Sequence, residues 1–350
     1  MTREEFLEKK DIRFSLSRYG IDAMGAMAQG LFASLLIGTI LSTAGKQLGI
    51  PFLVDAGTFA SSVAGPAMAV SIGYALHAPQ LVLFSLAAVG AAANSLGGAG
   101  GPLAVYLIAI AACEAGKAVS KETKVDILVT PAVTVLVGAG LSVLLAPAIG
   151  KAASSLGSVI MWATELQPFF MGIIVSVLVG IALTLPISSA AICAALSLTG
   201  LAGGAAVAGC CAQMIGFAVM SYKENGAGGL VSQGLGTSML QMPNIIKNPK
   251  VWIPPILASA VTGPIATCLF RLQMNGTPVS SGMGTCGLVG PIGVYTGWIQ
   301  DIEAGLKASV TFMDWAGLIL IAFVLPAVLT LLFAYACRKA GWIHDGDLTL

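Results

Sequence analysis

Long runs of hydrophobic residues, each with scarcely a charge inside it, divide this sequence into apolar segments separated by short polar stretches. A helix needs roughly 20 consecutive apolar residues to cross the hydrocarbon core of a bilayer. The pattern therefore predicts an all-α polytopic membrane protein. We expect spans at residues 23–44, 59–75, 81–93, 103–118, 127–149, 168–185, 192–220, 251–272 and 315–337.

The number of crossings depends on two glycine-rich segments. Residues 192–220 form a long run that glycine interrupts, and residues 283–298 can either cross the membrane or re-enter it from one side. The pattern fits about eight to ten crossings. We predict about ten transmembrane helices, with two re-entrant or broken-helix hairpins.

The polar stretches indicate how a single transmembrane domain, residues 1–350, is organised. Residues 1–20 mix apolar with basic side chains, as in an amphipathic helix on the membrane surface, although a frayed polar tail fits the first half equally well. Residues 21–150 form an N-terminal helical half and residues 168–338 a C-terminal half that contains hairpin segments. Between them we expect an interfacial connector helix at residues 151–167, and residues 339–350 form a tail.

Basic residues next to the outer spans predict the orientation of the chain. Lys and Arg are enriched in cytoplasmic loops, and they flank the first span as well as the last, at Arg338 and Lys339. With an even number of crossings, both termini face the cytoplasm. We therefore predict a multi-pass protein of the cell membrane (inner or plasma membrane).

Composition and charge exclude several classes of protein. Hydrophobic residues make up 57% of the 350 residues and charged residues only 9%, with a mean hydropathy of +0.91, so lipid must be the solvent. A net charge of +1 gives no basic stripe for nucleic acid. The seven cysteines have no metal-site spacing and are expected to pack in the core. We predict no metal, no cofactor and no catalytic residue, because HExxH and Walker A motifs are missing.

A short glycine-rich pattern occurs in both halves of the chain. GGAGGPLAVY (97–106) and GTCGLVGPIGVY (284–295) share a Gly-Pro step and a Val-Tyr ending, and each follows an asparagine, Asn94 or Asn275. Paired broken helices point to a transporter's binding site, because they expose backbone amides and carbonyls to a ligand. The same glycines would equally serve close helix packing and turns. We predict hairpin backbone at Gly97, Gly101, Pro102, Gly284, Gly287, Gly290 and Pro291.

Residues 221–250 are the most polar stretch near the membrane. Amide and hydroxyl side chains alternate there with Leu, Val and Met, a mixture that suits an uncharged polyhydroxy ligand. An interfacial helix on the membrane surface fits the same pattern. The predicted substrate-binding residues are Asn94, Gln233, Thr237, Gln241, Asn244, Asn275 and Thr285.

The run GLGTSMLQMPNIIKNPKVWIPPILASAVTGPIATCLF (234–270), followed by NGTPVSSGMGTCGLVGPIG (275–293), resembles the PTS EIIC-like membrane family. That family is related to the sugar-specific IIC subunits of the phosphoenolpyruvate:sugar phosphotransferase system and includes regulators of the PfoR type. The resemblance implies a ten-helix homodimeric permease with re-entrant hairpins near the sugar. The His and Glu that better characterised IIC subunits place at the sugar have no equivalent here, since neither His77 nor His344 lies in a matching motif.

The leading hypothesis is therefore an EIIC-like permease that translocates a small polar solute, expected to be a sugar. Within this sequence no IIA or IIB domain follows Cys337, so phosphorylation of the sugar would require a separate soluble IIB-type partner. A membrane sensor or regulator of the PfoR type, which keeps the permease fold without transport, is the alternative. An ion-coupled symporter is disfavoured because few carboxylates lie within the spans.

Overall fold

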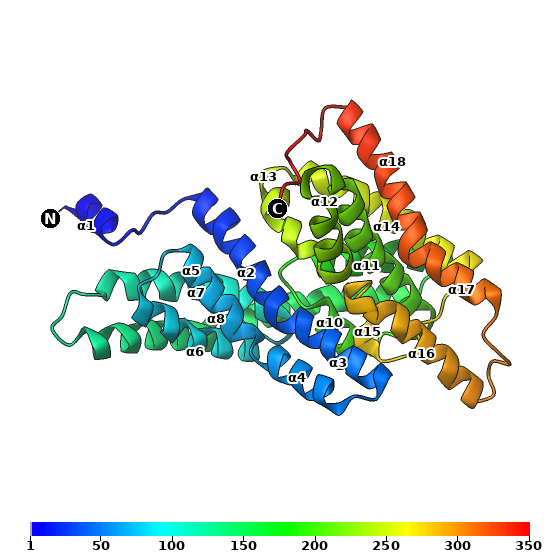
Figure 1. The fold of residues 1–350 in the computed structure, drawn as a ribbon, viewed down its shortest axis with the longest axis horizontal. Coiled ribbons are helices and arrows are strands. Elements are labelled where there is room, and N and C mark those ends of the chain that lie inside the picture. The colour runs from blue at the N-terminus through cyan, green and yellow to red at the C-terminus, as the bar shows by residue number, and fades with distance from the viewer. Residues whose placement is uncertain (1) are drawn as a thin grey trace. The chain divides into compact units, whose positions relative to one another are not determined.

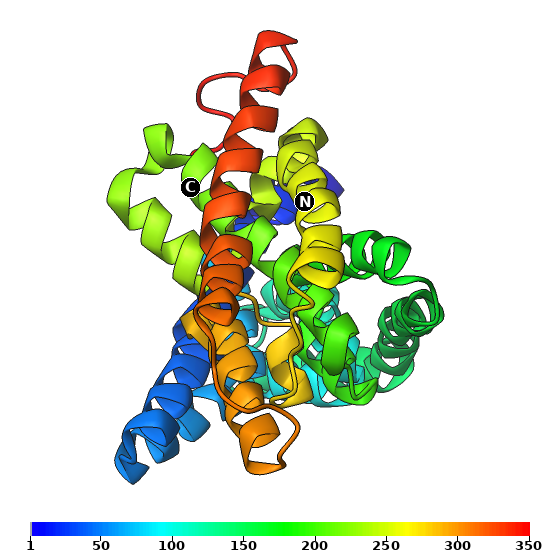
Figure 2. The ribbon, with the colours of Figure 1, turned by 90° about the vertical axis from the view of Figure 1, so that its right-hand side faces the viewer.

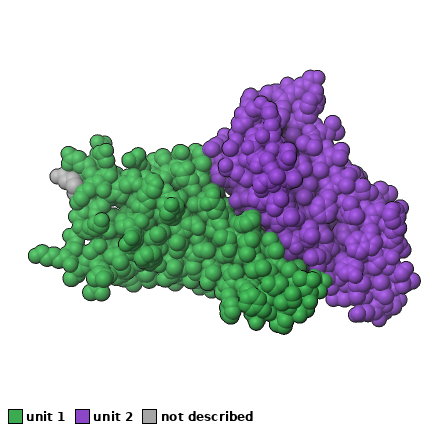
Figure 3. All heavy atoms as spheres, in the orientation of Figure 1, with its two compact units in different colours: residues 1–152 green, residues 153–350 purple. Residues whose placement is uncertain are grey.

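The computed structural model describes residues 2–350, and 81% of the chain is helical, with no strand among the described residues. The predicted all-α class is confirmed. Extended backbone pairs at one isolated antiparallel bridge between Gly200 and Met274. The chain divides into two compact units, residues 1–152 and residues 153–350, which Figure 3 colours separately.

Unit 1 begins with the short helix α1, which is followed by a continuous helical segment from Ser17 to Leu48 and five further helices (Figure 1). Its elements are α1 (Arg3–Lys9), η1 (Ser17–Ala23), α2 (Met24–Leu31), η2 (Phe32–Leu36), α3 (Ile37–Leu48), α4 (Pro51–Ser62), α5 (Ala64–Ala75), α6 (Gln80–Gly97), η3 (Gly98–Gly100), α7 (Gly101–Val119) and α8 (Asp126–Thr164). Helix α8 continues into unit 2, so that residues 151–164 of the predicted connector extend this helix.

Glycines set the turns and the close helix contacts of unit 1. Gly49, at φ +68°, ends α3, and Pro51 starts α4. Gly98, at φ +50°, separates α6 from α7, whose far ends meet where Val82 contacts Gly116. Helices α6 and α7 therefore run antiparallel.

Unit 2 is built around α11, most of whose residues are buried; α9, α14 and α18 pack against it (Figure 1). A Cβ at Gly209 would lie 1.8 Å from the carbonyl oxygen of Ser176, so backbones of α9 and α11 touch. The elements are α9 (Pro168–Thr184), α10 (Ser189–Ala195), α11 (Gly200–Met220), α12 (Tyr222–Val231), η4 (Ser232–Gly236), η5 (Ser238–Gln241), α13 (Met242–Lys247), η6 (Pro249–Trp252), α14 (Ile253–Pro264), η7 (Ile265–Leu269), α15 (Pro278–Ser281), η8 (Cys286–Leu288), α16 (Val289–Glu303), α17 (Phe312–Ile319), η9 (Leu320–Val324) and α18 (Leu325–Lys339).

Among the described residues, six helical segments are long and apolar enough to cross a membrane, or seven if the bent pair α4 and α5 forms one span. This identifies a multi-pass membrane protein, as the sequence predicts. The helix α9 is apolar but has only 17 residues. The six segments are Ser17–Leu48, Gln80–Val119, Asp126–Thr164, Gly200–Met220, Pro249–Leu269 and Phe312–Lys339.

Candidate functional site

Three of the predicted binding residues form one buried chain of hydrogen bonds in unit 2, which we call the amide network: Gln233, Gln241 and Asn244. The Nε2 of Gln241 donates to Oε1 of Gln233 at 2.9 Å, and Nδ2 of Asn244 donates to Oε1 of Gln241 at 2.8 Å. Gln233 in turn donates to the hydroxyl of Ser221 at 2.8 Å. The π-helical turn η4 and the short helices η5 and α13 bring these amides together, although they lie up to eleven positions apart.

The amide network is closed by residues 342–350, which we call the tail segment. The carbonyl of Leu348 accepts from Nε2 of Gln241 at 3.0 Å, and the carbonyl of Thr349 accepts from Nδ2 of Asn244 at 2.9 Å. The Leu348 side chain is fully buried. The sequence analysis missed this contact, and the sequence signal for it is the recurrence of apolar residues, Ile343 and Leu348 among them, in a stretch that also carries His344, Asp345 and Asp347.

Thr237 lies beside a second buried polar cluster, which the sequence analysis also missed. The hydroxyl of Thr237 caps η5 by accepting from the Met239 amide. The next residue, Ser238, shares a hydrogen bond of 2.8 Å with Thr184, and Thr184 donates to Gln213 at 3.2 Å. Because these side chains come from α9, α11 and η5, residue spacing gave no sign of the cluster.

The second glycine-rich pattern packs directly against the amide-rich stretch. Thr285 donates to the carbonyl of Gly234 at 2.5 Å, which joins η8 to η4. Gly284, at φ +52°, lies against Cys210 of α11, and its carbonyl accepts from the amide of Gly290 at 2.8 Å. Irregular backbone with positive φ also includes Gly287, and Pro291 lies within the first turn of α16. The structure therefore brings Thr285 close to the predicted segment that contains Gln233.

The first glycine-rich pattern lies in unit 1, at the turn between α6 and α7. Asn94 occupies the last turns of α6, where its side chain contacts the sites of Gly65 and Gly101. Gly97 faces Ala104 across the turn, and Pro102 is in the first turn of α7. Here the glycines serve tight packing between antiparallel helices.

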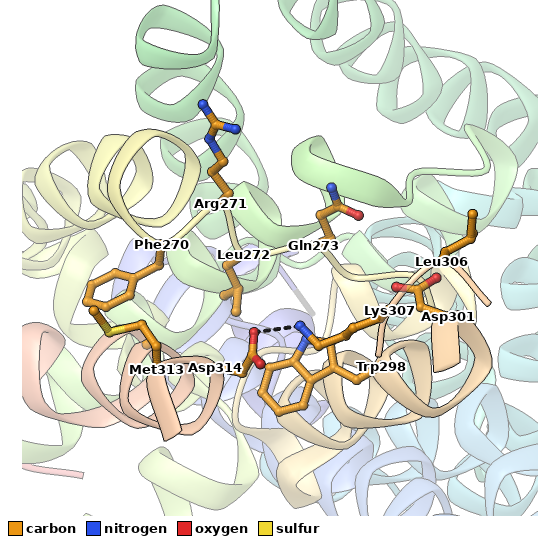
Figure 4. Close-up of a pocket in the computed structure, with 11 residues that line it drawn as sticks. Phe270, Arg271, Leu272, Gln273, Trp298, Asp301, Leu306, Lys307, Met313 and Asp314 are labelled. Atoms are coloured by element: carbon orange, nitrogen blue, oxygen red, sulfur yellow. Dashed lines mark hydrogen bonds and ion pairs between the residues drawn. The ribbon is translucent and has the colours of Figure 1, made fainter. Parts of the chain in front are cut away.

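Asn275 supports the wall of a polar pocket in unit 2. Its Nδ2 donates to the Asp301 carboxylate at 3.0 and 3.2 Å and to Oε1 of Gln273 at 3.2 Å. The pocket has a volume of about 290 Å³. Eleven residues line it: Phe270, Arg271, Leu272, Gln273, Trp298, Asp301, Leu306, Lys307, Met313, Asp314 and Gly317 (Figure 4).

The pocket lining is charged yet balanced, with two cations and two carboxylates. Lys307 donates to Asp314 at 2.8 Å and lies 5.9 Å from the centre of the Trp298 ring. Arg271 and Gln273 point away from this ion pair (Figure 4). The predicted substrate-binding residues include neither Asp301 nor Asp314. Only the fold shows that the 270–273 linker and the 304–311 loop, far apart in sequence, enclose one space.

The polar pocket and the tail segment lie at opposite ends of unit 2. Met274, next to the pocket-lining linker, pairs with Gly200 at the start of α11, whereas Arg338, just before the tail segment, contacts the carbonyl of Met220 at its end. Figure 2 shows α18 rising to one end and residues 304–311, in orange, at the other. A helix of 21 residues is about 31 Å long, close to the thickness of the bilayer core.

Comparison with known proteins gives one match. A family model described as "Phosphotransferase system, EIIC" matches residues 21–350, nearly the whole chain. No curated protein and no solved structure matches the chain.

Proposed function

Because the chain belongs to the phosphotransferase system EIIC family, we propose that it is a permease that carries a small polar solute, expected to be a sugar, across the cell membrane. The family implies a sugar substrate and a IIB-type partner. The observation that carries the proposal is the arrangement of unit 2. A polar pocket opens at one end of α11, and a polar network is closed off at the other end.

In this proposal the polar pocket is where the solute first binds. Its volume of about 290 Å³ is at the small end of ligand pockets and suits a monosaccharide. Among the described residues the Asp301 carboxylate accepts only from Asn275 and keeps free acceptor capacity, while the Arg271 guanidinium and the side-chain nitrogen of Gln273 make no hydrogen bond. A sugar hydroxyl both donates and accepts, so it can use both kinds of group.

The broken helices then provide the route through unit 2. The irregular backbone from Gly284 to Gly290 lies between α11 and η4, beside the amide network. Non-helical backbone at membrane depth is tolerated where protein or a cavity covers it. We propose that the solute passes along this backbone in an alternating-access movement, and that the amide network contacts it after the tail segment has opened.

The finer topology is part of the same proposal. The antiparallel pair α6 and α7, counted as two crossings, raises the number above the six apolar segments. Ten crossings would place both termini in the cytoplasm, as the flanking Arg338 and Lys339 favour. We further propose a homodimer, the commonest symmetric assembly. Mass measurement in nanodiscs checks this, and a monodisperse monomer that still binds sugar would argue against it.

The experiment that tests the proposed function is a thermal-shift screen of monosaccharides on the purified full chain, followed by titration of any hit. Binding raises the melting temperature because ligand stabilises the folded state by RT ln(1 + [L]/Kd). Asp301→Asn should weaken the affinity for the hit by about five- to 150-fold, since a charged acceptor is lost. Gln300→Ala, next to the pocket but outside its lining, should stay within about twofold. Equal affinity of the parent chain and Asp301→Asn for the sugar would show that the sugar does not bind in this pocket.

A membrane regulator of the PfoR type is the second candidate. The observation that favours it is that each side-chain nitrogen of Gln233, Gln241 and Asn244 already donates two hydrogen bonds, within the network, to neighbouring groups or to the tail segment. This conformation therefore leaves no amide N–H of the network for a solute. Uptake of the bound sugar into proteoliposomes distinguishes the two candidates. Binding without uptake, even with a IIB-type partner present, would favour the regulator.

A further inference from the structure

The tail segment is attached to unit 2 chiefly through its main chain. Nδ2 of Asn225 donates to the Leu348 carbonyl at 2.8 Å, and the amide of Leu350 donates back to Oδ1 of Asn225 at 2.9 Å. Asn248 binds the Trp342 carbonyl and the Asp347 carboxylate, each at 2.9 Å. Together with the bonds from Gln241 and Asn244, four amide side chains therefore hold one short stretch of backbone.

Few side chains of the tail segment reach the interior. Ile343 and Leu348 are buried, and the tail segment forms only turns and irregular backbone, with Gly346 at positive φ. No helix has to break for this segment to leave, because its main chain bonds to the side chains of these four amide residues and not to their helical backbone. Such a segment belongs to the parts of a protein that open by local unfolding.

Charged contacts at the outer edge of the tail segment are exposed. Asp345 pairs with Lys223 at 2.8 Å and with Arg338 at 2.9 Å, and these cations lower its pKa. Exposed ion pairs of this kind contribute little and weaken with salt. The attachment of the tail segment to the rest of unit 2 therefore depends mainly on the buried Ile343 and Leu348 side chains and the four amides.

The amides that hold the tail segment are those of the amide network. Nε2 of Gln241 is shared between Gln233 and the Leu348 carbonyl, and Nδ2 of Asn244 is shared between Gln241 and the Thr349 carbonyl. When the tail segment leaves, both donors face water. We propose that residues 342–350 are a reversible latch that covers the amide network and exposes it on release; its use as a gate for the solute rests on the proposed function.

Hydrogen exchange of the unmodified full chain in nanodiscs gives the first test. Backbone N–H groups of the tail segment, including that of Leu350, should exchange at least 100-fold faster than those of α11. The reason is that the latch opens while the rest of unit 2 stays folded. Exchange of both segments at one common rate would mean that the tail segment opens only by global unfolding, which overturns the latch.

The second test measures exposure of the amide network directly, in a Cys268→Ser background that removes an exposed thiol. Cys placed at Asn244 should react with a membrane-impermeant maleimide at least tenfold faster when Leu348→Asp is added. The matched control is Leu350→Asp, which adds the same charge at a half-exposed side chain and should stay within twofold of Asn244→Cys alone. The buried native Cys210, followed by mass spectrometry in the same samples, should stay unlabelled.

Two results would overturn the latch: equal labelling with and without Leu348→Asp, or labelling of Cys210 together with the residue at 244.

The gate is tested separately by uptake of the sugar hit, which Leu348→Asp should speed at least threefold; unchanged uptake with faster labelling overturns the gate. Absence of uptake in every variant counts against the proposed function, while exchange and labelling still decide the latch.

Discussion

At the scale of single residues, the buried amide side chains of the amide network are paired within the chain. Gln233, Gln241 and Asn244 have the chemistry of a sugar site, and in this conformation they hydrogen-bond each other and the tail segment. Their substitution should therefore affect stability before any ligand is added.

Gln241→Ala tests this view. The substitution leaves the side-chain oxygen of Gln233 without its donor in a buried region. It also removes one of the two donors that the Leu348 carbonyl has there, the other being Asn225. An unsatisfied buried polar group costs about 1–3 kcal/mol, so the melting temperature of the full chain should fall by several degrees. Gln300→Ala, on an exposed side chain, is the control and should leave it unchanged. An unaltered melting temperature for Gln241→Ala would show that water replaces the lost amide.

At the scale of elements, two kinds of contact can be tested separately, polar docking outside the spans and close packing at glycines within them. The helix α1 is held by a capping box between Thr2 and Glu5 and is joined to the turn after α7 through Glu122, which pairs with Lys9 and Lys10. In unit 2 the backbones of α9, α11 and α14 meet at glycines. The two kinds of contact respond to different perturbations.

The docking of α1 should depend on pH. Hydrogen bonds from Lys10 and Lys9 lower the pKa of Glu122 from 4.5 to about 2. Because the folded pKa is depressed, the contact is fully present above pH 4.5 and is lost as the pH falls through about 2. Labelling of Lys9 by an acid-tolerant reagent should rise over this window. Glu122→Gln should already show the high labelling at pH 7, and salt should act in the same direction because the Lys9–Glu122 pair is exposed.

Gly209→Ala should disrupt the packing of α11. The added Cβ would lie 1.8 Å from the Ser176 carbonyl oxygen, closer than any real Cβ contact, so α9 and α11 must move apart. Overpacking of this kind costs about 1–3 kcal/mol or more. Gly140→Ala, whose Cβ would meet no atom within 4 Å, is the matched control and should be neutral or slightly stabilising. Equal melting temperatures would refute the close contact.

At the scale of the whole molecule, unit 2 has a pocket at one end and a covered polar network at the other, separated by α11. This is the arrangement that a carrier needs if each end faces a different compartment. The family match covers nearly the whole chain and supports a role in sugar transport.

Labelling from the two sides of the membrane checks this arrangement. In a Cys268→Ser background, Cys at the exposed Leu306 and Cys at the exposed His344 should react with an impermeant reagent from opposite sides, with position 344 in the cytoplasm. The two positions are expected on opposite sides because α11, which separates them, is about as long as the bilayer core is thick. Labelling of both positions from one side would mean that α11 does not span the membrane.

The sequence by itself determined the class of protein. Apolar runs and few charges required lipid as the solvent, and a bilayer admits only helices or closed barrels, so helical spans could be predicted from local pattern. The motifs in residues 234–270 and 275–293 together were sufficient for the family, because short-range residue identity carries that information.

Only the tertiary structure decided which polar groups meet. Residue spacing could not show that Leu348 covers Gln241, or that Asp301 and Gln273 share a pocket, since those pairs are far apart in sequence. Nor could it tell a glycine that breaks a helix, such as Gly284, from one that lets two helices touch, such as Gly209. A residue's type fixes which bonds it can make, whereas the packing of distant helices fixes which partner comes within reach.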